Sequence, residues 1–204
     1  ADLKNNRPMR SCDRMMVASI SKPFTAAVIM KLIDDGLLTL ESEVKNYVSA
    51  EITTKVANVS EAKVKHLLSH RSGIPDYYNM EQLLDQINTN DRITTFEGFL
   101  EYVYGKKAEF EVDESYSYSN NNFVLLGIIA EQASGKTLKQ LYQEIIFDPL
   151  QLSSGYFDME NPFPADMPKG YVDVFADDTR IESEFLYRDE ARTPDGGIII
   201  NNLD

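Results

Sequence analysis

The chain has 204 residues, 43% of them hydrophobic, which is enough for one sizeable core, or for one domain and part of another. Its 33 acidic and 20 basic side chains give a formal net charge of -13, which would repel a phosphate backbone, so we expect no nucleic-acid partner. The longest apolar run, from Phe123 to Ala130, is far shorter than the roughly 20 residues that cross a bilayer. Residues 1–18 contain no apolar signal-peptide core, so the chain predicts neither a transmembrane segment nor a signal peptide.

The first half of the chain predicts a loop, a short strand and two helices. Residues 1–18 are polar and rich in turn-forming residues, and they end in a strand-like MMVAS segment. Apolar residues recur from Pro23 to Asp35 with the spacing of a mostly buried helix, which Gly36 ends. A second helix is expected from Glu61 to Ser69, with Ser60 as its N-cap.

The second half contains the strongest helix signal and then loses its periodicity. Short helical patterns such as TFEGFLEYVYG precede a helix predicted from Asn122 to Ser134, which Gly135 ends. A capping box from Thr137 to Gln140 opens another helix, which Pro149 limits. We interpret the GKT sequence between these helices as a turn, because the upstream glycine of a phosphate loop is missing. After Leu152, frequent Gly, Pro and Asp predict long loops with a few short strands.

A serine three residues before a lysine is a weak pattern, and it occurs at Ser19, Ser42 and Ser60. Residues three apart share one helix face, so the hydroxyl and the amine can meet there. A lysine accepts a proton only when it is uncharged, which burial or a positive surrounding favours. The Ser19 pair meets both conditions, since apolar residues flank it and a helix begins there. At the Ser42 copy, flanking glutamates would keep Lys45 charged, and Ser60 is explained as a helix cap. The alternative for Ser19 is also a helix cap.

Two tyrosine-x-asparagine motifs, at Tyr77 and Tyr118, would suit a serine site. A tyrosine can donate or accept a proton, and an asparagine can hold a substrate amide. The Tyr77 copy follows a proline turn, whereas the Tyr118 copy directly precedes the strongest predicted helix. We therefore favour Tyr118 with Asn120. The alternative is a core tyrosine whose hydroxyl meets a helix end.

The histidines and the cysteine predict no metal or redox chemistry. His66 and His70 are four residues apart, the spacing of a metal-binding pair on one helix face, but the zinc-protease glutamate and a third ligand are missing. We expect a buried, hydrogen-bonded histidine pair, no metal and no cofactor. The single cysteine, Cys12, cannot form an internal disulfide, and we expect it to be structural.

Several segments, taken together, resemble a known superfamily. They read VASISKPFTAAVIMKLIDDGLLTLESEVKNYV, KVKHLLSHRSGIPDYY, YSNNNFVLLGIIAEQASGKTLKQLYQEIIFDPLQL and PDGGIII. Their order and content resemble the serine β-lactamase and D-alanyl-D-alanine carboxypeptidase superfamily. The class C-like branch, which includes penicillin-binding-protein-like enzymes and esterases, is the most similar. The resemblance runs from about Ala1 to the C-terminus and is far more specific than either short motif.

This resemblance implies an acyl-transfer site. It implies that Ser19 is the acylated nucleophile, that Lys22 is a base or proton shuttle and that Tyr118 is the second acid/base. Asn120 would orient the substrate amide. Whether Lys22 or Tyr118 takes the first proton stays open, because a closely coupled pair can share it. The backbone N–H of Ser19 would be one half of an oxyanion hole.

The resemblance also implies an α+β fold in which a helical lobe packs against an antiparallel sheet. The family's proline-glycine turn before the tyrosine motif is replaced here by Val112 and Asp113. The family's opening strands and its third motif, a lysine or histidine followed by threonine or similar and glycine, are not found in the chain. We therefore expect residues 1–204 to be a partial β-lactamase-like serine hydrolase domain, mainly the helical lobe with an incomplete antiparallel sheet, from a longer protein.

The leading functional hypothesis is a serine hydrolase or acyltransferase that acts through an acyl-enzyme on a β-lactam, a D-alanyl peptide or a small ester. The implied partner is a small molecule or a peptidoglycan peptide, and the implied location is periplasmic or otherwise outside the cytoplasm. One alternative is a penicillin-binding or sensing module that is acylated without turnover. Another is a catalytically inactive structural fragment. The sequence carries no signal of oligomeric state.

Overall fold

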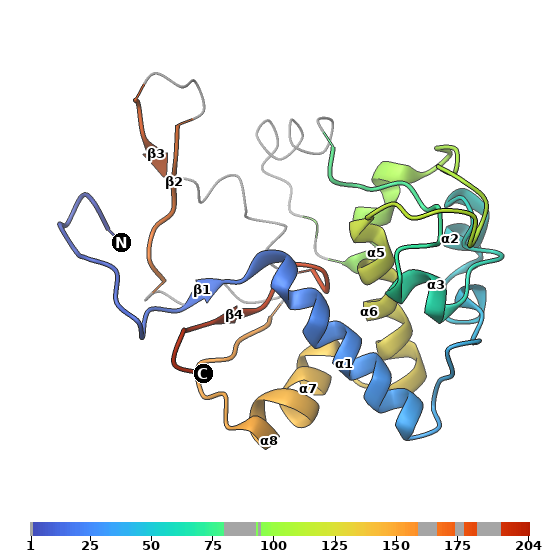
Figure 1. Ribbon diagram of the computed structural model, residues 1–204, viewed down its shortest axis with the longest axis horizontal. Coiled ribbons are helices and arrows are strands. Elements are labelled where there is room, and N and C mark those ends of the chain that lie inside the picture. Colours follow the sequence, from blue (N-terminus) through green and yellow to red (C-terminus); the bar gives the residue numbers. More distant parts are fainter. Residues whose placement is uncertain (1, 80–92, 94, 159–166, 174–177, 183–192) are drawn as a thin grey trace.

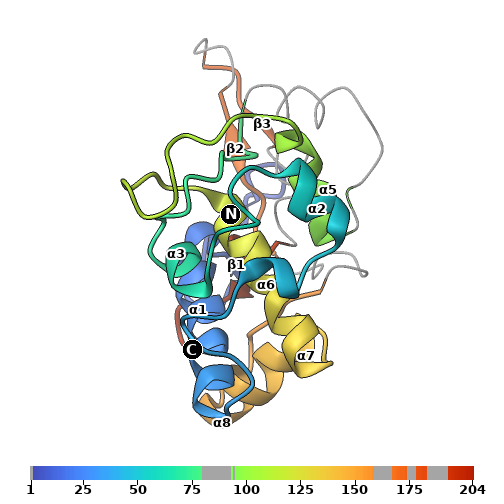
Figure 2. The same ribbon diagram turned by 90° about the vertical axis from the view of Figure 1, so that its right-hand side faces the viewer.

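The computed structural model describes residues 2–79, 93, 95–158, 167–173, 178–182 and 193–204. Helices dominate this part of the chain, and Figures 1 and 2 show them gathered into one lobe, with small antiparallel strand pairs beside it. The predicted α+β class, mainly a helical lobe with an incomplete antiparallel sheet, is confirmed.

The helical lobe contains both regular and irregular helices. The α-helices are α1 (Ser21–Asp34), α2 (Ala50–Lys55), α3 (Val64–Leu68), α5 (Phe96–Leu100), α6 (Asn120–Ser134), α7 (Leu138–Tyr142) and α8 (Asp148–Leu150). Single 3-10 turns form η1 (Ala18–Ile20), η2 (Val44–Asn46) and η3 (Glu101–Val103), and a π-helical turn, η4 (Gln143–Phe147), joins α7 to α8.

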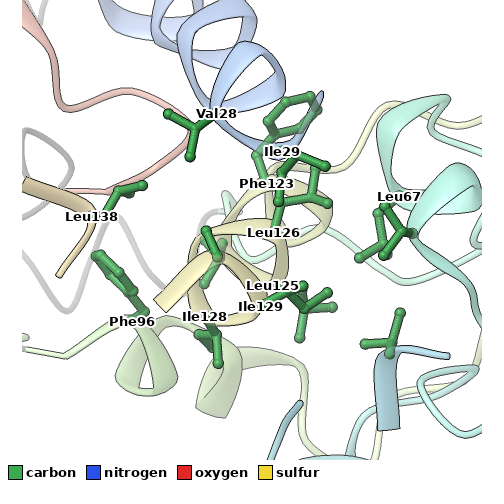
Figure 3. Packing of buried hydrophobic residues seen from close by; sticks show 14 of the residues in the cluster. Val28, Ile29, Leu67, Phe96, Phe123, Leu125, Leu126, Ile128, Ile129 and Leu138 are labelled. Atoms are coloured by element: carbon green, nitrogen blue, oxygen red, sulfur yellow. The ribbon is translucent and has the colours of Figure 1, made fainter. Parts of the chain in front are cut away.

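Helix α6 is the centre of the core. Every residue from Asn121 to Ala130 is buried, so this helix is covered on all sides, as a helix that is apolar all round must be. Figure 3 shows the side chains that surround it, which come from α1, α3, α5 and α7 (Val28, Ile29, Leu67, Phe96 and Leu138). The first turn of α6 is thereby held on a rigid element next to α1.

The small sheet joins segments from the two ends of the described chain. Strand β1 (Met15–Met16) pairs antiparallel with β4 (Ile199–Ile200), with Met15 opposite Ile200. Strands β2 (Tyr171–Val172) and β3 (Ile181–Glu182) form a separate antiparallel pair, which Figure 1 shows projecting away from the helices. Because β1 leads directly into η1 and α1, its pairing with β4 fixes where α1 begins.

The main helix predictions hold, with small shifts of the boundaries. Helix α1 was expected from Pro23 and begins at Ser21, and Gly36 follows its end with a φ of +75°. Helix α6 begins at Asn120 rather than Asn122, and Gly135 caps it in the left-handed conformation. The capping box formed by Thr137 and Gln140 opens α7, so the GKT sequence is a turn between helices, as predicted.

The prediction that Ser60 is an N-cap is wrong. Helix α3 begins later, at Val64, and its N-cap is Lys63. Lys63 stays extended because it pairs with Glu43 in an antiparallel bridge, and its N–H donates to Nδ1 of His66 at 3.1 Å. A helix starting after Ser60 would break that bridge.

The expectation of a structural role for Cys12 is also wrong, because Cys12 is exposed. The buried side chain of this turn is instead that of its neighbour Asp13, which accepts hydrogen bonds from Arg7 and Arg10. A charged group held by two arginines takes the inner position here, so the thiol points outward.

The segment from Thr193 to Ile198 is fixed between α1 and α6. Thr25 donates to the carbonyl of Pro194 at 2.5 Å, and Ser21 Oγ accepts the N–H of Ile198 at 3.0 Å. On the other side, Pro194 packs directly on Gly127 of α6, where a Cβ atom would lie 2.3 Å from Pro194 Cγ. A helical glycine is therefore required for this segment to approach α6.

We expect Gly127→Ala to destabilise the protein by about 1–3 kcal/mol, the usual cost of overpacking a core. Helix propensity alone would favour alanine by about 1 kcal/mol, so the two effects have opposite signs. Urea unfolding of the intact protein measures the difference. A variant as stable as the wild type, or more stable, would show that the contact between α6 and Pro194 is loose.

Candidate active site

Ser19 lies exposed in η1, between the small sheet and α1. The N–H of Val17 donates to the carbonyl of Ile198 at 2.9 Å, and Ala18 then takes a left-handed φ of +47°. This conformation is costly for a residue with a Cβ atom, and such strain often accompanies functional turns. The N-caps of η1 and α1 are Val17 and Ile20, so the structure does not use Ser19 as a helix cap.

Lys22 is buried at the start of α1, with 5% of its surface exposed. Its Nζ donates to Ser19 Oγ at 3.1 Å and to Asn120 Oδ1 at 2.7 Å. A third hydrogen bond runs to the backbone carbonyl of Asp195 at 2.9 Å. Three donated hydrogen bonds use the full donor capacity of a lysine ammonium group. The three acceptors come from η1, from α6 and from the segment before β4.

Tyr118 reaches Ser19 from the loop that precedes α6. Its hydroxyl lies 2.9 Å from Ser19 Oγ, in a position to donate, and its ring centre lies 4.9 Å from Lys22 Nζ. The side chain is 42% exposed, so Tyr118 is not the core tyrosine of the alternative interpretation. Ser19 Oγ is therefore approached by both an amine and a phenol.

Asn120, the first residue of α6, connects Lys22 to a carboxylate. Its Oδ1 accepts from Lys22, while its Nδ2 and its backbone N–H donate to Asp76 at 3.0 and 3.2 Å. A lysine on one side and a carboxylate on the other determine which amide atom is oxygen. Burial raises the pKa of Asp76, and these donated hydrogen bonds oppose that shift.

Tyr77 and Asp195 form a buried pair behind Lys22. The Tyr77 hydroxyl donates to Asp195 Oδ2 at 3.1 Å, and the same carboxyl oxygen lies 3.8 Å from Lys22 Nζ. Burial raises the pKa of Asp195, although the nearby Lys22 acts in the opposite direction. The tyrosine-x-asparagine motif at Tyr77, which the sequence analysis did not favour, thus places its tyrosine in the core next to the site.

The two histidines are both buried and hydrogen-bonded, but they do not share one helix face. Helix α3 ends at Leu68, and His70 lies beyond it with a left-handed φ of +54°. His66 Nδ1 accepts from Lys63, whereas His70 Nδ1 accepts from the N–H of Ser119 at 3.2 Å. Their spacing therefore does not create a common metal-binding face.

Val112 and Asp113, the residues that replace the family's proline-glycine turn, lie in a turn. Asp113 takes a left-handed φ of +70°, and aspartate is one of the few residues that tolerate it. Its Oδ1 accepts from Arg71 Nε at 2.5 Å, and its N–H donates to the Arg71 carbonyl at 2.9 Å. An arginine contact thus stabilises a conformation that glycine would adopt freely.

The structure brings the four predicted residues, Ser19, Lys22, Tyr118 and Asn120, into one hydrogen-bonded cluster. Sequence reasoning did not place His70, Asp76 or Asp195 at the site, although all three contact this cluster, and it considered His70 only for its spacing from His66. Each lies inside a segment that carried the family resemblance, SHRSGIPDYY or PDGGIII, but no spacing rule connects it to Ser19 or Tyr118. In the described ranges, no group of three or more His, Cys, Asp or Glu side chains could hold a metal ion. Within the same ranges, no helix is long and apolar enough to span a bilayer.

Comparison with known proteins identifies the family. The family model described as "Beta-lactamase" matches residues 1–202. The chain therefore belongs to the beta-lactamase family. It is 31% identical over 151 residues to a penicillin-binding protein of Bacillus subtilis (strain 168), covering 73% of this chain and 32% of that protein. It is 26% identical over 174 residues to a D-aminopeptidase of Cereibacter sphaeroides (strain KD131), covering 84% of this chain and 32% of the relative.

Solved structures show the same fold, that of the β-lactamases and transpeptidases. The octameric penicillin-binding protein homologue from Pyrococcus abyssi superposes with a TM-score of 0.80 at 27% identity, over 99% of this chain and 45% of its own. A D-stereospecific amidohydrolase from Streptomyces superposes with a TM-score of 0.82 at 23% identity, over 94% of this chain and 58% of its own. The chain spans about a third of the length of the curated relatives named above.

We expect the neutral His70 to make the protein less stable as the pH falls. Its pKa is lowered, first because burial disfavours the imidazolium and second because Lys22 lies close. An unfolded histidine binds a proton near pH 6.5, so between the two pKa values the unfolded state holds more protons and the free energy of unfolding rises with pH. The contribution of His70 is complete above pH 6.5 and is lost as the pH falls through the lowered folded-state pKa.

Urea unfolding of the wild type and of His70→Asn over this pH range measures the effect. The difference in free energy of unfolding between the two proteins should shrink as the pH falls. The buried carboxyls Asp76 and Asp195 titrate in both proteins with raised pKa values, so their contribution largely cancels in the difference. A difference that stays constant with pH would contradict a buried neutral His70.

Proposed function

We propose that this protein is a serine hydrolase in which Ser19 is acylated by a small amide, peptide or ester substrate. The observation that carries the proposal is the position of Ser19 Oγ, which lies 3.1 Å from the Lys22 amine and 2.9 Å from the Tyr118 hydroxyl. A serine hydroxyl becomes a nucleophile when a neighbouring group can take its proton, and two such groups are within reach here. Membership of the beta-lactamase family supports the same chemistry.

The proposed reaction begins when Ser19 Oγ attacks the substrate carbonyl carbon and its proton passes to the pair formed by Lys22 and Tyr118. The C–N or C–O bond of the substrate then breaks, the leaving amine or alcohol receives that proton, and an ester on Ser19 remains. Water attacks this ester and gives up one proton, which passes through the same pair to Ser19 Oγ as the bond from Oγ to the acyl carbon breaks and the acid product leaves. With three hydrogen bonds donated, Lys22 is an ammonium group at rest, so the pair takes the serine proton in the form that has one proton fewer; Lys22 and Tyr118 are therefore treated as one coupled acid/base pair.

The proposed substrates contain a D-amino acid residue or a β-lactam ring. The relatives named above are a penicillin-binding protein and a D-aminopeptidase, and their names support this class. Asn120 is proposed to orient the substrate amide, through the exchange of its hydrogen bond with Lys22 for one with the substrate. Similarity to a penicillin-binding protein also supports a location outside the cytoplasm. The acylated serine would be the endpoint of the reaction if the protein were a sensor.

We expect a penicillin to add its whole mass to Ser19 of the intact protein, a fluorophosphonate probe to add its mass less HF, and Ser19→Ala to abolish both labels. Because Ser19 is exposed and caps no helix, the variant should keep its fold. Mass spectrometry of the intact protein and of its peptides identifies the labelled residue.

Ser42→Ala and Ser60→Ala are the matched controls, since each removes a serine three residues before a lysine without touching the cluster. Both should be labelled like the wild type. Label that is released with time indicates a hydrolase, and label that is never released indicates a sensing module. No label on folded wild-type protein would eliminate the acyl-transfer proposal.

Tyr118→Phe should slow acylation by about 10²–10⁴-fold, the usual contribution of a general acid or base. The change removes one hydroxyl, whose described contact is with Ser19 Oγ, and keeps the ring. Stopped-flow measurement of acylation by a chromogenic β-lactam or D-amino acid amide gives the rate. Tyr116→Phe, at a 62% exposed tyrosine two residues earlier, is the control and should acylate normally. Equal rates for the two variants would remove Tyr118 from the acid/base pair.

A further inference from the structure

The loop that carries Tyr118 belongs to no helix or strand. Residues 116–119 have neither assignment, and Tyr118 itself is 42% exposed. Its hydroxyl nevertheless lies within hydrogen-bonding distance of Ser19. Because displacement of a reacting group by about 1 Å can cost roughly 10²-fold in rate, some group must hold this loop in place.

His70 contacts this loop on both sides of Tyr118. Its backbone carbonyl accepts the N–H of Ser117 at 3.1 Å, and its ring Nδ1 accepts the N–H of Ser119 at 3.2 Å. Between these two contacts, the imidazole stacks on the Tyr118 ring with a centroid distance of 4.5 Å and an interplanar angle of 28°. One residue thus fixes the backbone before and after Tyr118 and the orientation of its ring.

The tautomer of His70 follows from its neighbours. The Ser72 hydroxyl donates to Asn122 Oδ1 at 2.6 Å, which leaves Asn122 Nδ2 to donate to His70 Nδ1 at 3.1 Å. Since Nδ1 accepts from both Asn122 and Ser119, the ring proton lies on Nε2 and the imidazole is neutral. The left-handed φ of +54° at His70 keeps the ring in this position, and His70 is 9% exposed.

We propose that His70 is a positioning residue that holds the Tyr118 hydroxyl against Ser19. This inference rests on the proposed acyl transfer. His70 touches neither Ser19 nor a reacting atom in the described contacts, so it acts through Tyr118. His70 acts in two ways: its Nδ1 accepts a hydrogen bond from the loop, and its flat ring stacks on the Tyr118 ring.

Two variants separate these parts. His70→Asn keeps an acceptor near the position of Nδ1 and tolerates the left-handed backbone, but it removes the ring. His70→Phe keeps a ring and removes the acceptor. His66→Asn is the matched control, because His66 also accepts a backbone N–H through Nδ1 but belongs to the cap of α3.

We expect each His70 variant to acylate about 10- to 100-fold more slowly than the wild type, with little change in KM. His66→Asn should acylate at the wild-type rate. The decisive readout is the double variant with Tyr118→Phe. If His70 acts through the phenol, adding His70→Asn to Tyr118→Phe slows acylation no further, whereas general damage to the fold would slow it by the same factor again.

The proposal would be overturned if the two substitutions slow acylation independently in the double variant, or if both His70 variants fold and acylate at the wild-type rate. Either result would leave acyl transfer at Ser19 intact. A wild-type protein that is never acylated would overturn both. If the His70 variants do not fold, Ser72→Ala provides the test, because it removes the hydroxyl that orients Asn122 and accepts the N–H of Ile74, and leaves His70 and Tyr118 themselves unchanged. It should slow acylation measurably, and only when Tyr118 is present; an unchanged rate would also overturn the proposal.

Discussion

The buried amine of Lys22 is the constraint on which the arrangement of the site depends. A lysine removed from water must find acceptors for its N–H groups, and leaving such a group unpaired costs several kcal/mol. Its three acceptors lie in η1, at the first residue of α6 and in the segment before β4. These segments are far apart in the sequence, so one side chain requires that they meet.

The hydrophobic core makes that meeting possible. Helix α6 is buried on all sides, and the side chains of α1 pack directly against it, so the first turns of the two helices have a fixed separation. The segment containing Asp195 enters between them because Thr25 binds the Pro194 carbonyl and Gly127 leaves room for the proline ring. Apolar packing thus determines the position of the polar groups.

A second group of residues supports the polar cluster from the segment between α3 and Tyr77. Asp76 holds Asn120, His70 holds the Tyr118 loop, and Ser72 orients Asn122 beside it. Each of these contacts links a turn to the start of α6. A site made of one exposed serine and one loop tyrosine would otherwise have few restraints on its geometry, and a site works only when such restraints are present.

The sequence by itself determined the fold class, the main helices and the four residues that meet in the cluster. Local chemistry was sufficient for these, because glycine stops, capping boxes and apolar periodicity act over a few residues, and because long matching segments resembled one superfamily. It did not determine the start of α3, where a bridge from Lys63 to the distant Glu43 overrides the local serine cap. Nor did it connect His70, Asp76 or Asp195 to the site, because the partners that join them to it lie between 44 and 173 residues away. Only tertiary structure decides which distant groups face a buried amine or a loop tyrosine, because those contacts depend on how the helices pack and leave no periodic pattern in the chain.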